Sequence, residues 1–117
     1  MQPRSLEIED LAGGENEPHI LRLHGPLILS TLFDFQSKVR AGRSHHLILD
    51  FTDVPYVDSA GIGALVAAYV RHHRDDHGLS LVGVSERVQA ALKLAHIEQF
   101  FRFFDSVSQA QASSSAA

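Results

Sequence analysis

The segment from Val54 to Leu65, VPYVDSAGIGAL, holds the residues of this chain whose types and spacing could support chemistry. Asp58 and Ser59 form a polar pair between the apolar runs HLILDF and GALVAAYV. A serine in this position can cap a helix, act as a nucleophile or accept a phosphate group. Capping by Asp58 or Ser59 is the simplest interpretation, because the first amide groups of a helix need acceptors.

The nucleophile interpretation has less support in the sequence. The run D-S-A-G between an expected strand and an expected helix is similar to the nucleophile elbow G-x-S-x-G. Val57 stands where that motif has its first glycine, however, and no acid and histidine follow in a fitting order. A complete phosphate-binding glycine motif is also absent from the sequence. We therefore expect no catalytic residues, no cofactor and no enzymatic activity.

Modification of Ser59 would have unequal effects on the domain and on a partner. A phosphate group adds about −1.5 to −2 charges. The start of a helix stabilises such a charge by about 0.3–1 kcal/mol, whereas the neighbouring carboxylate of Asp58 opposes it. The fold should therefore change little. A partner docked over the site would instead have to bury an unpaired charge, which is costly, so this pattern is typical of a binding switch.

The helix expected from about residue 59 to 73 has an unusual outer face. No charged residue occurs from Ser59 to Val70, although a helix face in contact with water normally carries several. The face is therefore either a docking surface for a partner or a surface covered by another helix of the same domain. The wheel places Ile62, Leu65, Val66, Tyr69 and His73 toward the core, and Gly63, Ala64, Ala67 and Arg71 opposite, with Ala68 at the margin.

The elements that must position this helix alternate along the chain. Apolar periodicity and turn residues predict strands and helices in turn, which indicates crossover connections and a largely parallel sheet. Ser30 or Thr31 is expected to cap the first helix, and Ser85 with Glu86 to open the third. The expected strands are 6–10, 19–25, 46–51, 80–84 and 100–104, and the expected helices are about 30–40, 59–73 and one from about 85.

Composition limits the classes of function. The 117 residues fit one domain, and ten Lys and Arg against fourteen Asp and Glu give a net charge of −4. No basic stripe of the kind that binds duplex nucleic acid is visible. The longest apolar run, residues 60–70, is shorter than the roughly 20 residues that cross a bilayer. We expect a cytoplasmic protein without membrane insertion, with a domain at 1–110 and a disordered tail at 111–117, where SSSAA ends a polar, low-complexity segment.

The histidines permit one metal hypothesis. In HHRDDH, His73 and His77 have the i, i+4 spacing with which two histidines on one helix can chelate a metal. Histidine and arginine near the end of a helix also suit its dipole, and this segment is expected to be a turn before the next strand. We therefore predict no metal site.

The run from His46 to Ala110, HLILDFTDVPYVDSAGIGALVAAYVRHHRDDHGLSLVGVSERVQAALKLAHIEQFFRFFDSVSQA, resembles a STAS domain of the bacterial anti-sigma factor antagonists, and the resemblance extends over about Leu6 to Ala110. The resemblance implies an α/β fold, with a four- to five-stranded mixed, largely parallel sheet against three to four helices. It also implies that Ser59 is phosphorylated by an anti-sigma factor with serine-kinase activity and restored by a protein phosphatase. The partner-binding residues expected from it and from the local chemistry are Asp58, Ser59, Ala60, Gly61, Gly63, Ala64 and Ala67.

The sequence departs from the antagonist pattern at two positions. Many antagonists have an acidic residue in a G-x-L-D pattern after the second strand, and here Ile28 occupies that place in GPLILS. The second serine of the common D-S-S-G is Ala60. These departures keep an alternative open, in which the domain only docks, as an accessory module of a lipid-transporting ABC complex or another signalling complex.

Overall fold

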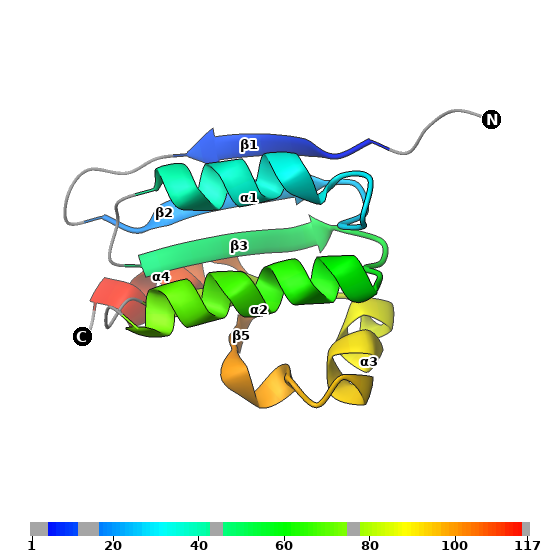
Figure 1. Cartoon of the computed structure of the whole chain (residues 1–117). Helices are drawn as coiled ribbons and strands as arrows, with labels where there is room; N and C mark the ends of the chain where they lie inside the picture. The colour runs from blue at the N-terminus through cyan, green and yellow to red at the C-terminus, as the bar shows by residue number, and fades with distance from the viewer. Residues whose placement is uncertain (1–4, 12–16, 43–45, 75–77, 116–117) are drawn as a thin grey trace.

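A five-stranded sheet forms the centre of the structure, a computed structural model that describes residues 5–11, 17–42, 46–74 and 78–115 (Figure 1). The strands lie in sequence order, with the first pair antiparallel and the other pairs parallel. The mixed, largely parallel sheet is confirmed. The strands are β1 (Glu7–Leu11), β2 (His19–His24), β3 (His46–Asp53), β4 (Gly78–Val82) and β5 (Arg102–Phe104).

Helices cover both faces of the sheet, which explains why the central strand is apolar on both sides. Helices α1 (Leu32–Ala41) and α2 (Ser59–Arg74) lie side by side on one face, and α4 (Val107–Ser115) lies on the other (Figure 1). In β3, Leu47, Ile48 and Leu49 are each at most 1% exposed. The remaining helices are α3 (Glu86–Leu94) and the short 3-10 helix η1 (Glu98–Phe100).

Alternation along the strands divides the apolar side chains between two cores. The larger core, under α1 and α2, contains Leu21, Leu49 and Phe51. The smaller core contains Ile20, Ile48, Val82 and Ala110, and lies between the sheet and α4. Because both cores depend on β3, the end of this strand has a fixed position, and the loop that leads from it to α2 starts from a rigid base.

The helix starts agree with the sequence in one case and differ in another. At α3 the hydroxyl of Ser85 accepts a hydrogen bond from Val88 N at 3.2 Å, as predicted. At α1, Thr31 occupies the N-cap position without a side-chain cap bond. Its hydroxyl instead donates to Pro26 O at 2.8 Å and accepts from Ile28 N at 3.0 Å, so it stabilises the loop before the helix.

The end of the chain differs from the expectation of a disordered tail from residue 111. Helix α4 continues to Ser115, while 116–117 lie outside the described residues. At its start Ser106 Oγ accepts from Gln109 N at 3.2 Å, and Gln109 Oε1 accepts from Asp105 N at 3.0 Å, an exchange close to a capping box. Ala110, fully buried, anchors the helix on the sheet. The polar composition of this segment is thus compatible with a helix, because the side chain that it buries is small.

Candidate functional site

Asp58 is the residue that caps α2. Its Oδ1 accepts a hydrogen bond from Gly61 N at 2.8 Å, and its carbonyl accepts the first helical bond from Ile62 N at 2.9 Å. Of the two capping alternatives, the structure therefore supports Asp58. Ser59 is the first helical residue and is exposed, and its hydroxyl forms no hydrogen bond to any part of the chain that the structure describes.

Asp58 also joins two loops that are far apart in the sequence. Its Oδ2 accepts from Leu29 N at 3.0 Å, and its amide donates to Leu27 O at 3.4 Å. Leu27 and Val57 form a parallel bridge next to these bonds. The loops follow β2 and β3, which are parallel neighbours, so both leave the sheet at the same edge. The segment GPLILS, where the antagonist pattern changes, therefore lies directly beside Ser59.

The two glycines of this segment have different surroundings. A Cβ atom at Gly61 would clash with the carbonyl oxygen of Leu27, so this glycine permits close approach within the domain itself. A Cβ atom at Gly63 would meet nothing within 4 Å. Gly63 therefore contributes open surface, whereas Gly61 is needed to bring the two loops together.

The outer face of α2 is narrower than the helical wheel predicted. Ala64 and Ala68 are only 4% and 3% exposed, because α1 lies beside α2 on the same face of the sheet. The placement of Ala64 on a docking surface is therefore wrong, and the alternative of a covering helix holds on this side. Gly63 and Ala67 remain exposed, next to the half-buried Val66. Of the other predicted site residues, Ala60 is half-buried at the start of the helix.

Asp50, a buried acidic residue within β3, has a structural role. It is 7% exposed, and its carboxylate accepts from Thr52 Oγ1 at 2.6 Å and from Arg22 Nε at 3.1 Å. Burial alone would raise its pKa, but the hydroxyl and amide of Thr52 and the Arg22 guanidinium lower it below its usual value. Asp50 therefore links β3 to β2 through its ion pair with Arg22, on the face of the sheet that α4 covers in part.

Two large exposed apolar side chains, one in the loop after β2 and one in the first turn of α1, were not identified from the sequence. Leu29 and Phe33 are 63% and 65% exposed, and the amide of Leu29 is the one bonded to Asp58. Phe33 could have been found, because it falls outside the buried stripe of α1, which consists of Leu32, Phe35 and Val39. Leu29 adds an exposed apolar side chain beside Asp58, whereas Phe33 lies with Ser5 and Leu6 at the start of α1.

The metal hypothesis rested on residues that the structure does not fully describe. Residues 75–77 and the side chain of His73 lie outside the described part of the chain. His72 is buried, and its Nδ1 lies 2.8 Å from the carbonyl oxygen of Ala68, to which it donates a hydrogen bond. Among the described residues, no group of three metal-ligating side chains is present, and no helix is long and apolar enough to cross a membrane.

These features define an α/β domain whose candidate site is an exposed serine at the start of a helix with an uncharged outer face. The chain belongs to the STAS domain family, whose model matches residues 12–110. This result confirms the resemblance seen in the sequence.

Solved structures with this fold come from two functional settings. An anti-sigma factor antagonist from Mycobacterium paratuberculosis has a TM-score of 0.78 at 16% identity, over 93% of this chain and 95% of that one. The unphosphorylated anti-sigma factor antagonist SpoIIAA has a TM-score of 0.76 at 15% identity, over 96% and 97%. SLC26A9 has a TM-score of 0.77 at 20% identity over 86% of this chain, which spans only 20% of that longer protein. At these identities the likeness shows the fold.

Proposed function

We propose that this protein is an anti-sigma factor antagonist, a non-catalytic cytoplasmic protein whose binding is switched by phosphorylation of Ser59. The observation that carries the proposal is the exposed hydroxyl of Ser59, directly after the capping residue Asp58 and beside the uncharged face of α2. The unphosphorylated form binds an anti-sigma factor that is also a serine kinase. The similarity of the fold to two anti-sigma factor antagonists supports this partner class.

The geometry explains how a phosphate would act on binding and leave the fold unchanged. Both carboxylate oxygens of Asp58 already accept amide hydrogen bonds, from Gly61 and Leu29. Ser59 takes no part in this cap, so a phosphate on its hydroxyl leaves both bonds in place. A partner that covers Ser59 and Gly63 would have to desolvate about two additional negative charges next to a carboxylate. Release of the partner follows, and a protein phosphatase restores the binding form.

The proposal is tested with the anti-sigma factor encoded in the same genome and with matched serine variants. Ser59→Asp should weaken binding at least tenfold, whereas Ser59→Ala should bind as the unmodified protein does. Ser37→Asp is the control, because Ser37 is an exposed serine within α1. Intact mass of the protein from its native cells should show one added phosphate that Ser59→Ala abolishes. Equal affinity of Ser59→Asp and wild type would refute the switch.

A docking-only module in a transport or signalling complex is the second candidate function. Ile28 in place of the usual acidic residue lies in the loop that Asp58 holds, where a kinase would be recognised. STAS-like folds also occur in SLC26A9 and in a sulfate transporter family protein from Wolinella succinogenes, the latter with a TM-score of 0.72 at 22% identity. An unphosphorylated protein that co-purifies with a transporter subunit would favour this candidate. Neighbouring genes for an ABC permease and ATPase would point the same way.

A further inference from the structure

Two side chains of β2 connect the strands on either side of it. Arg22 Nη1 lies 3.4 Å from Glu9 Oε2 in β1, and Arg22 Nε lies 3.1 Å from Asp50 Oδ2 in β3. His24 lies two residues further along β2, on the same face of the sheet. Its Nε2 is 2.8 Å from Glu9 Oε1, and its Nδ1 is 2.8 Å from Asp53 Oδ2. Both side chains therefore join the edge strand β1 to β3 across β2.

The two bridges respond differently to pH. A guanidinium stays protonated in proteins, so the bridge through Arg22 is permanent. An imidazole donates from both ring nitrogens only when it is protonated, because the neutral ring keeps a single N–H. The geometry at His24, with a carboxylate at each ring nitrogen, is therefore that of the protonated ring. Loss of one proton removes one of the two hydrogen bonds and the positive charge between the carboxylates.

The charged groups that face His24 come from all three strands. Glu7 lies opposite His24 in the register of β1 and β2, and Glu9 follows on the same face of β1. Asp53 lies beside His24 in the register of β2 and β3, and Arg22 is the neighbouring cation on β2. The hydrogen bond to Glu9 raises the pKa of His24 above 6.5, desolvation opposes this rise, and the bond to Asp53 adds to it. The His24 side chain is 31% exposed, so it can exchange its proton with water while the domain stays folded.

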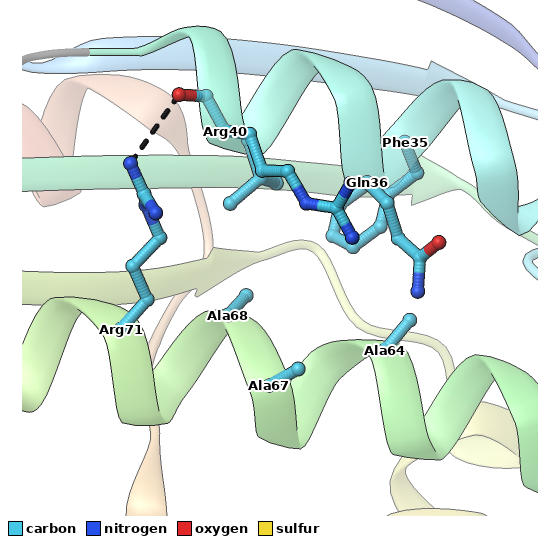
Figure 2. A pocket seen from close by; sticks show the side chains of 8 residues that line it. Phe35, Gln36, Arg40, Ala64, Ala67, Ala68 and Arg71 are labelled. Atoms are coloured by element: carbon cyan, nitrogen blue, oxygen red, sulfur yellow. Dashed lines mark hydrogen bonds between the residues drawn. The ribbon is translucent and has the colours of Figure 1, made fainter.

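Other polar contacts of the described chain do not need a second proton on a histidine. Helices α1 and α2 are joined by a hydrogen bond from Arg71 to the carbonyl oxygen of Arg40 at 3.3 Å, beside alanine side chains that point from α2 toward α1 (Figure 2). This donor is a guanidinium and does not titrate. His19, at the start of β2, uses one ring nitrogen for Asp10 at 2.6 Å, which a neutral ring can supply. The bridge through His24 is thus a contact of β1 that depends on full protonation of a ring.

We propose that His24 is a proton-dependent latch on the edge strand β1, closed when both ring nitrogens carry a proton and open when one proton is lost. With the latch open, β1 keeps its backbone pairing with β2 and the bridge through Arg22, but it separates from β2 more often. Each separation uncovers the outer edge of β2, and an uncovered strand edge can pair with another strand. The latch involves no residue of the site around Ser59, so it is independent of phosphorylation.

Amide hydrogen exchange of the full chain from about pH 6 to about pH 9 tests the latch, with the titration of His24 followed by NMR in the same samples. Protection factors, which correct for the intrinsic pH dependence of exchange, should fall about twofold to fivefold for β1 amides as His24 loses its proton, in keeping with an exposed ion pair. They should stay below those of β4, a strand inside the sheet, because an edge strand can open alone. Equal protection of β1 and β4 would show that β1 opens only with the whole domain, and would overturn a local latch.

Three variants decide whether His24 is the group responsible. His24→Asn should remove the pH-dependent step in β1 protection. Arg22→Gln should lower β1 protection by about twofold to fivefold at every pH and keep the step. His96→Asn is the control, because His96 is an exposed histidine outside the sheet with a φ of 59°, which asparagine tolerates; it should leave the step unchanged. A step that persists in His24→Asn, or constant β1 protection through the titration of His24 in the wild type, would overturn the proposal.

Discussion

Replacement of Asp58 by alanine is the most direct test of how the site is built, because one side chain makes two structural bonds. Loss of the cap on Gly61 N should cost about 0.5–2 kcal/mol. The bond to Leu29 N is more exposed, and its loss should cost about 0.5–1 kcal/mol. The sum, about 1–3 kcal/mol, corresponds to a decrease of the melting temperature by about 3–15 °C for a domain of this size.

Matched variants separate the two bonds of Asp58. Asn caps helices about as well as Asp, so Asp58→Asn should keep the bond to Gly61. It would lose an acceptor toward Leu29, and should therefore cost about 1 kcal/mol or less. Ser59→Ala should change stability by less than about 0.5 kcal/mol, because Ser59 is not the cap. Urea unfolding of the four proteins measures these differences. A large loss in Ser59→Ala together with a negligible loss in Asp58→Ala would refute the assignment of the cap.

Three further predictions concern the support of the site. Gly61→Ala should destabilise the domain by about 2–3 kcal/mol, because the added Cβ would meet a main-chain carbonyl oxygen. Gly63→Ala, the matched change in open space, should stabilise the domain by about 0.5–1 kcal/mol. Thermal unfolding measures both differences. The hydrogen bond to Glu9, aided by a second carboxylate from β3 and opposed by desolvation, raises the pKa of His24 above 6.5. His24 should therefore contribute stability that is complete below about pH 6.5 and is lost as pH rises through the raised pKa. Urea unfolding of His24→Asn from about pH 6 to about pH 9 should lack this pH dependence. An NMR titration that places the pKa of His24 at or below 6.5 would contradict the prediction. Ala110→Asp should bury an unpaired charge and detach α4, seen as loss of amide protection in hydrogen exchange; retained protection would show that α4 does not depend on this contact.

The order and type of the strands and of helices α1 to α3 followed from the sequence because strong local signals agreed with one another, whereas the last helix, α4, was not predicted. The apolar run in β3, the period of Val88 and Leu92 in α3 and the Ser85 cap each indicated the correct element. The exposed face of α2 could not be derived in this way. A helical wheel gives directions around one helix, whereas the number of neighbours depends on tertiary packing, and alanine occurs in both environments. The neighbouring α1 therefore buries Ala64 and Ala68, which the wheel had placed outside or at the margin.

The division of roles between Asp58 and Ser59 is what makes a switch at this position physically consistent. If Ser59 were the cap, a phosphate on its hydroxyl would replace the acceptor of a helix amide, and modification would affect the fold as well as binding. In the structure Asp58 holds both Gly61 and the loop at Leu29, so the hydroxyl of Ser59 has no structural task in the described chain. The helix start also stabilises added negative charge by about 0.3–1 kcal/mol at an exposed site, which offsets part of the repulsion from Asp58. Under the proposed function, the charge of a phosphate on Ser59 would therefore change the free energy of partner binding more than the free energy of folding, because a partner would desolvate that charge.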